Sequence, residues 1–396
     1  MTMGRREFVL GTGASIVTGP TLAGLFALPP SGASPGRLAA TTDGQLAALN
    51  LESARQASWT RFRQTPQVPG IAEVIVEQEL LAAQFLGDMG AYDRLQALGA
   101  QLALMEPRAP RTVRIRAQIA SATHRFAEAR ALLAEAGTGG TSDGDAERLL
   151  LSIDQAQGAH PAAVLAQRRR LAERSGRLED LVPLGAALAE SGDFDEAELA
   201  YLQGLASYGD ASPFAVAWVC FQLGAMWGEQ VPEPQPGRAA RWYAQAIRTF
   251  PDYVKARVHL AEIRVGEDQY PAAEALLHRA LTSSDPEVRW RLADVMAATG
   301  RGEEANMQLR AAQAGFEGLL ESHLLAFADH GAQFYLGSGD DAARAFELAR
   351  ANLANRPTLR AFELAHSAAI AAGAPQAAAE LVAAARARWG PGVSFQ

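Results

Sequence analysis

The sequence has few of the residues on which most catalytic and metal sites depend. Among its 396 residues, Cys220 is the only cysteine, which excludes an intramolecular disulfide and a multi-cysteine zinc or iron–sulfur site. Lys255 is the only lysine, and no lysine-bearing phosphate loop is present. Aromatic residues make up 7% and β-branched residues are sparse, so the composition disfavours a β-sheet fold.

The abundant residues favour helices that pack closely. Hydrophobic residues make up 48% of the chain and alanine dominates them, which suits small-residue helix packing. The formal net charge is −8, and an acidic chain is a poor nucleic-acid binder. We therefore expect an all-α protein that has no nucleic-acid partner.

The segment 1–33 has the pattern of an export signal. Arg5 and Arg6 are followed by Phe8 and then by a mildly apolar stretch that glycine and proline interrupt. This stretch is too polar for a convincing membrane span, which needs about 20 mainly apolar residues. The segment resembles a bacterial twin-arginine signal peptide, with Gly4 where that pattern usually has serine or threonine.

The resemblance implies export of a folded protein to the periplasm or another extracytoplasmic compartment. The small residues Ser31-Gly32-Ala33 would permit cleavage before Ser34, with 34–41 as a linker. Two alternatives stay open. One is a general secretory signal, and the other is an uncleaved signal that anchors the chain to the membrane.

An internal repeat dominates the rest of the chain. One unit carries Leu184 and Gly185 in its first helix, Phe194 at the turn, and Ala197 and Tyr201 in its second helix. This unit resembles a tetratricopeptide repeat (TPR), a 34-residue helix pair. Small residues let the two helices approach closely, while large ones fill the gaps between neighbouring pairs.

Stepping along the chain from Gly185 locates the other units. Steps of 34 residues toward the N-terminus reach anchors at Leu151, Ala117 and Ala83. Less even steps toward the C-terminus reach Gly224, Ala261, Ala293, Gly331 and Ala365. Alanine recurs about twelve residues after the anchors. The spacing is irregular at a proline-rich segment, 231–238, and between Ala314 and His330.

These observations predict an all-α fold, a right-handed α-solenoid of about nine antiparallel helix pairs in a TPR-like superhelix. The predicted domains are an N-terminal capping helix within 42–72, regular repeats over 73–230, the proline-rich insertion 231–238, less regular repeats over 239–390 and a tail, 391–396. A capping helix is expected because the open end of a solenoid exposes apolar surface.

No constellation of residues indicates catalysis. His323 and His330 lie two helical turns apart beside Asp329, but a zinc site needs three or four convergent ligands. The other histidines are scattered along the repeats. No nucleophile elbow or cysteine–histidine arrangement is present, so we expect a non-enzymatic protein with no metal and no cofactor.

The inner face of the superhelix is the expected binding surface, because in TPR proteins the first helices line the groove that holds the partner. A period of 3.6 residues projects onto this face Arg111, Arg114, Gln118, Arg148, Gln155, Trp218, Phe221 and Trp290. The arginines suit a carboxylate or an acidic peptide. The aromatics would be binding hot spots if they were exposed, whereas a shift of one residue in phase would bury them.

The sequence therefore predicts a scaffold or assembly factor that acts outside the cytoplasm and binds a protein or an extended peptide, either acidic or ending in a carboxylate. The alternative is an envelope solenoid that binds carbohydrate or a small ligand through the aromatics. The third hypothesis is a helical enzyme.

Overall fold

The computed structural model describes residues 41–136, 144–393 and 395, and the predicted signal 1–33 lies outside them. Within the described ranges the regular structure is all helix, with no strand. None of the described helices has the length and hydropathy that crossing a membrane requires.

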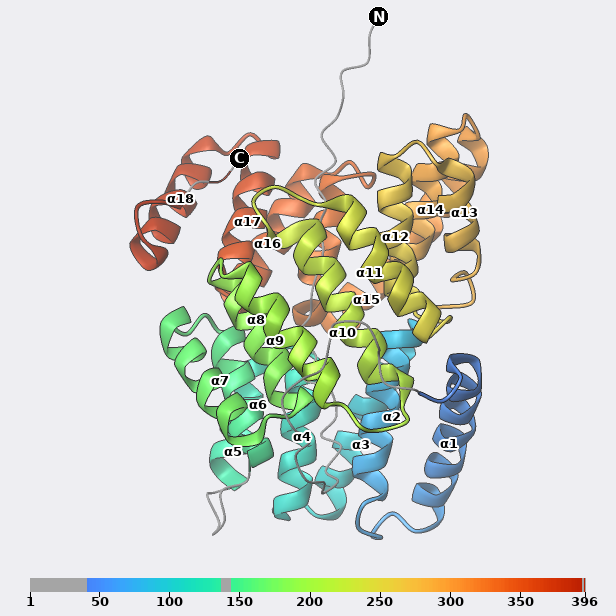
Figure 1. The fold of residues 1–396 in the computed structure, drawn as a ribbon, viewed down its shortest axis with the longest axis vertical. Coiled ribbons are helices and arrows are strands. Elements are labelled where there is room, and N and C mark those ends of the chain that lie inside the picture. The colour runs from blue at the N-terminus through green and yellow to red at the C-terminus, as the bar shows by residue number, and fades with distance from the viewer. Residues whose placement is uncertain (1–40, 137–143, 394, 396) are drawn as a thin grey trace, which may run out of the picture.

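Nine antiparallel helix pairs follow a single helix, α1 (Gly44–Gln64), in the described part of the chain (Figure 1). The first helices are α2 (Ile71–Leu86), α4 (Pro110–Ala122), α6 (Gly144–Ala156), α8 (Leu178–Glu190), α10 (Pro213–Ala225), α12 (Val254–Gly266), α14 (Pro286–Ala298), the C-terminal part of α15 (Gly302–Leu336) and α17 (Leu359–Ala371). The second helices are α3 (Gly90–Met105), α5 (Phe126–Ala136), α7 (Pro161–Ser175), α9 (Phe194–Ser207), α11 (Pro236–Thr249), α13 (Tyr270–His278), the N-terminal part of α15, α16 (Ala342–Asn355) and α18 (Pro375–Trp389). Each pair packs on the next, so the predicted all-α solenoid of nine pairs is confirmed.

The anchor residues lie where the two helices of a pair come closest. All nine anchors are buried. A Cβ atom built on Gly224 would lie 2.6 Å from the ring of Tyr243, and one built on Gly185 would lie 3.0 Å from the ring of Tyr201. Glycine is needed at these two anchors because the aromatic ring of the second helix occupies the space of a side chain.

The irregular spacing before the eighth pair has a structural cause. Helix α15 contains the second helix of the seventh pair and the first helix of the eighth, merged across a kink at His323. His323 has non-helical angles, φ −140° and ψ 48°. One residue thus makes the change of direction for which the other pairs use a turn.

The proline-rich insertion follows a widened helical turn. Helix α10 continues into a π-helix, η1 (Met226–Gln230), and the backbone N–H of Gln235 then donates to the carbonyl of Trp227 at 2.7 Å. π-Helical turns are rare and often occur at functional sites. Here the turn carries Glu229, whose carboxylate accepts a hydrogen bond from Tyr243.

Helix α1 covers the first pair. It packs along α2, where the guanidinium of Arg55 lies 3.0 Å from the buried carboxylate of Glu79. The Asp43 side chain caps the helix by accepting from the N–H groups of Gln45 and Leu46 at 3.0 Å. The helix therefore has both a cap of its own and a buried ion pair to hold it on the solenoid.

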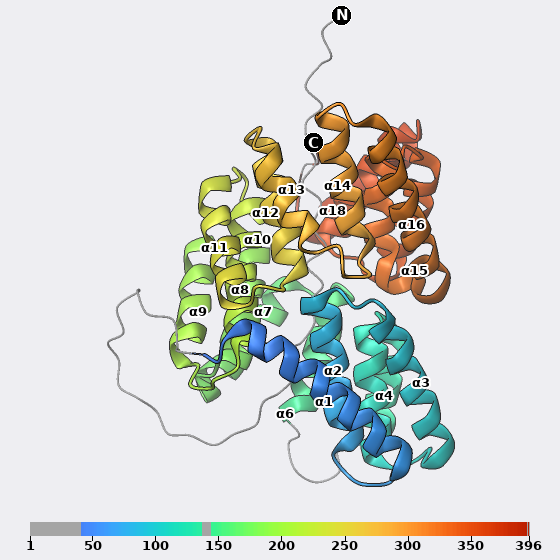
Figure 2. The same cartoon turned by 90° about the vertical axis from the view of Figure 1, so that its right-hand side faces the viewer.

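The curved stack brings distant pairs together. In Figure 1 the early helices form the lower part of the molecule and α11 to α18 the upper part, and Figure 2 shows α2 to α4 beneath α14 to α16. Helix α2 packs against α12, and the N–H of Ser284 donates to the carbonyl of Gly87 at 3.0 Å. The first pair therefore contacts the later pairs directly.

Candidate binding surface on the inner face

The eight residues projected onto the inner face do not share one environment. Arg114 and Gln118 are exposed on α4. Arg111 is half-buried, with its Nε 3.6 Å from the carboxylate of Glu106. Trp218 is half-buried against the core that α8 to α12 form. The structure thus leaves Arg114 and Gln118 as the members of the set with exposed side chains.

Arg148 and Gln155 contact the next pair. Arg148 donates to the two carboxylate oxygens of Asp180 at 2.8 and 2.7 Å, and Gln155 donates to Glu190 at 2.8 Å. Hydrogen bonding to Asp180 raises the pKa of Arg148. These bonds hold α6 against α8, and a partner carboxylate could bind Arg148 only by displacing Asp180.

The placement of Phe221 and Trp290 on an exposed inner face is wrong. Their exposed fractions are 5% and 4%. The ring of Phe221 lies 5.4 Å from that of Tyr243, and the ring of Trp290 lies 5.5 Å from that of Phe334. In these two pairs, the side chain three residues before the anchor lies between its own second helix and the first helix of the next pair.

Polar side chains of the later first helices occupy the positions two residues before and one residue after the anchor. In α12 these positions hold His259 and Glu262, and in α14 they hold Arg291 and Asp294. A residue advances by about 100° around a helix, so one step separates a core position from a lining position.

A buried charge network links these residues across three pairs. His259 Nδ1 lies 3.1 Å from Glu229 Oε1 and 3.3 Å from Glu262 Oε2. Glu262 Oε1 lies 2.6 Å from Arg291. The hydroxyl of Tyr243 donates to Glu229 at 2.9 Å, and its ring stacks on His259 with centroids 5.3 Å apart. Each charge is therefore held by an opposite charge from a neighbouring helix.

Arg291 connects the network to the eighth pair. Its guanidinium stacks over the ring of Trp290 at 3.6 Å and lies 3.7 Å from Asp294. Ser338, in the turn after α15, donates to Asp294 and accepts from the indole N–H of Trp290 at 3.0 Å. These contacts connect the seventh pair to the eighth and hold their polar side chains in place.

The stability of the network is expected to depend on pH through His259. Burial alone would lower the pKa of His259, but the charges of Glu229 and Glu262 outweigh it and raise the pKa to about 10. Because this value exceeds the unfolded one of about 6.5, the stabilisation is complete below pH 6.5 and is lost as the pH rises through 10. We expect the gap in unfolding midpoint between the wild type and His259→Gln to be largest at pH 6 and to shrink by pH 10. An unchanged gap would contradict this account.

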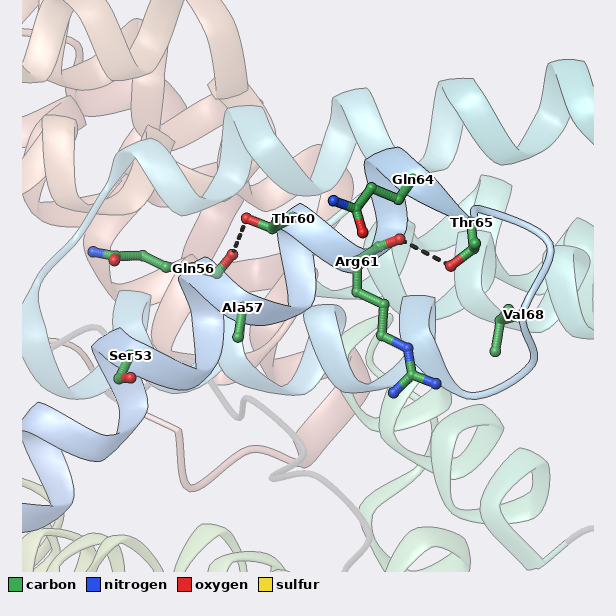
Figure 3. A pocket seen from close by; sticks show the side chains of 8 residues that line it. All are labelled: Ser53, Gln56, Ala57, Thr60, Arg61, Gln64, Thr65 and Val68. Carbon is green, nitrogen blue, oxygen red and sulfur yellow. Dashed lines mark hydrogen bonds between the residues drawn. The ribbon is translucent and has the colours of Figure 1, made fainter.

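A shallow depression lies along α1, away from this network (Figure 3). It is lined by Ser53, Gln56, Ala57, Thr60, Arg61, Gln64, Thr65 and Val68. The hydroxyls of Thr60 and Thr65 already donate to carbonyls of their own helix, at 2.8 and 3.1 Å. Nearly all of the lining is exposed and none of it converges on a point, so the depression has no built site.

Metal ligands do not converge in the described ranges, where no group of three or more His, Cys, Asp or Glu side chains is arranged to hold an ion. His323, which the sequence placed near His330 and Asp329, turns away and bonds through Nε2 to Asp93 at 2.8 Å.

Comparison with known proteins finds likeness in structure alone. No family model and no curated protein matches the sequence. The human IFIT1 dimer with PPP-AAAA has a TM-score of 0.45 at 12% identity, with 87% of this chain and 95% of that chain covered. The APC/C hetero-tetramer Cut9–Hcn1 has a TM-score of 0.43 at 13% identity, with 86% and 65% covered. The C-terminal part of a TPR repeat-containing protein from Cytophaga hutchinsonii has a TM-score of 0.30 at 14% identity, with 74% and 97% covered. The fold class, an all-α solenoid, rests on the pairing of this chain's own helices.

Proposed function

We propose that the protein is a non-enzymatic scaffold that acts outside the cytoplasm and binds a protein or an extended peptide along its inner face. The supporting observation is the lateral pairing of charged side chains there. Arg148 with Asp180 and Glu262 with Arg291 fix polar groups of neighbouring first helices in place. Because Glu262 and Arg291 are buried, these pairs support the surface and do not contact the partner, and a rigid support reduces the entropy lost on binding.

The second pair supplies the first point of contact in this proposal. Arg114 and Gln118 are exposed one turn apart on α4 and suit a carboxylate or an acidic peptide. The carbohydrate alternative has lost its main support, because Phe221 and Trp290 are buried and present no aromatic strip. Export by a twin-arginine route is inferred from Arg5, Arg6 and Phe8 alone.

The proposal is tested by affinity capture from the periplasmic fraction of the native host, with a C-terminally tagged chain as bait. We expect the chain itself in that fraction and at least one co-purifying protein, whose recovery falls about tenfold or more in Arg114→Glu. Such a reversal replaces a charge-assisted contact by repulsion.

The matched control is Arg310→Glu, which reverses an exposed arginine on α15 and should leave capture unchanged. Circular dichroism checks that both variants keep the helical fold. Equal capture by Arg114→Glu and the wild type would overturn the role of the second pair. A bait found only in the cytosol would overturn the exported location.

A further inference from the structure

Where the curved stack meets itself, residues of the first two pairs touch the fifth to eighth pairs along a line that we call the seam. Its apolar part is an aromatic insertion. Phe85, at the end of α2, lies with its ring 5.0 Å from that of Phe214, 5.6 Å from Phe250 and 4.5 Å from Tyr253. Phe85 is 3% exposed, so it belongs to the core of the fifth pair although it is covalently part of the first.

The polar part of the seam continues from the same corner. Ser284 Oγ accepts from the N–H of Met89 at 2.8 Å, while the N–H of Ser284 donates to the carbonyl of Gly87 at 3.0 Å. Further along, His323 Nε2 bonds to Asp93 at 2.8 Å. Two of these bonds join residues that are 195 and 230 positions apart, and they hold the first pair against the later pairs.

His124 makes the contact of the second pair. It lies in the turn after α4 in a left-handed conformation, φ 54°, and is 7% exposed. Its Nδ1 bonds to the carbonyl of Leu325 at 3.1 Å, so Nδ1 carries a hydrogen, and its own carbonyl accepts from Asn355 Nδ2 at 2.9 Å. One residue is therefore bonded to both α15 and α16.

The surroundings of His124 oppose a positive charge. Arg356, at the end of α16, is the cation that acts on it most strongly, while Asp329 on α15 partly compensates and His330 on α15 adds to the repulsion. A small void beside the ring is also lined by Lys255 and Asp285. Burial and then the charge of Arg356 lower the pKa of His124 to about 3.

We propose that the seam is an acid-opened latch, in which protonation of His124 separates the first two pairs from the later ones and opens the superhelix. This inference concerns the chain alone and does not depend on the proposed partner. Opening exposes Phe85, Met89 and Tyr92, which pack into the cores of the later pairs, so the open form is a minor population that protonation increases. The void beneath the seam lowers the cost of separation, since its lining lacks part of its packing contacts.

The direction of the pH effect follows from the thermodynamic linkage between protonation of His124 and closure of the seam. A histidine whose pKa is lowered in the closed form stabilises closure fully above its open-state value of about 6.5 and progressively loses this effect as the pH falls toward 3. Between pH 7.5 and pH 5 the open population should rise about thirtyfold. The His323–Asp93 pair also crosses the seam, with side chains that are 4% and 69% exposed, and it is unchanged in a variant of His124.

The experiment is amide hydrogen exchange on the full chain at pH 7.5 and pH 5, corrected for the intrinsic effect of pH. The reporters are the N–H groups of Met89 and Ser284, which bond across the seam. We expect their protection to fall about thirtyfold at pH 5, while the amides of α8, away from the seam, keep theirs. The helical circular dichroism should be the same at both pH values.

The decisive variant is His124→Asn. Asparagine tolerates the left-handed backbone, offers a neutral donor for the Leu325 carbonyl and does not titrate. Its seam amides should show no acid-induced loss of protection, whereas the matched control His278→Asn, an exposed histidine on α13, should behave like the wild type. Wild-type protection that is the same at both pH values, or a His124→Asn chain that opens as readily as the wild type, would overturn the latch.

Discussion

Replacing Arg291 by methionine is expected to lower the free energy of unfolding by about 3–5 kcal/mol, because it leaves the buried carboxylate of Glu287 without a cation and that of Glu262 with His259 alone. Both carboxylates are more than nine-tenths buried, so water cannot replace the guanidinium. Methionine retains most of the volume of the side chain, and therefore the loss measures the charge and not a cavity. The measurement is urea unfolding at pH 7 followed by circular dichroism, with the slope compared between variants.

A second substitution separates charge from packing at this site. Adding Glu262→Gln to Arg291→Met removes one of the two buried carboxylates, and the double variant should recover part of the lost stability. The exposed Arg310→Met serves as the control and should change stability by less than about 0.5 kcal/mol. Strictly additive losses in the double variant would show that Glu262 and Arg291 do not act as a pair.

Gly224→Ala is expected to destabilise the fifth pair by about 1–3 kcal/mol, since overpacking forces buried groups to move. The new Cβ would lie 2.6 Å from two ring atoms of Tyr243, which is 1% exposed. The ring cannot retreat easily, because its hydroxyl is bonded to Glu229 and its face stacks on His259. The unfolding midpoint in urea reports the change.

The matched control is Gly318→Ala in α15, where no atom lies within 4 Å of the new Cβ. Alanine has the higher helix propensity, so this variant should gain about 0.5–1 kcal/mol. If alanine destabilises the protein at Gly224 and stabilises it at Gly318, then close helix approach, and not helix propensity, is the reason for glycine at the anchor. A neutral Gly224→Ala would contradict that explanation.

The spacing of small residues was enough to locate the helix pairs. All nine anchors predicted from the sequence are buried, and all except Leu151 are glycine or alanine, because the closest contact of a pair involves residues near in sequence and favours small ones. The rule is less reliable in the second helices. Ala129 and Ala197 are buried as expected, whereas Ala163 is exposed and its neighbour Val164 is buried. The turn between the helices varies in length, and each added residue rotates the next helix by about 100°.

The same phase sensitivity explains what the sequence missed at the inner face. Phe221 and Trp290 were expected on the inner face and are buried, whereas Arg291, next to Trp290, and Glu229 of the charge network were not identified. Polarity alone did not single out His259 and Glu262, because the same helix also carries Lys255, Arg257 and Arg264. No pattern in the sequence indicated Glu229, because its orientation depends on a π-helical turn.

The sequence by itself determined the helix pairs, their number and the glycines at two anchors, because these depend on contacts within one repeat. Only the tertiary structure decided which side chains line the inner face and that the stack closes on itself. The bond between His124 and Asn355 spans 231 positions. Such contacts arise from small rotations summed over several pairs, and no single repeat encodes that sum.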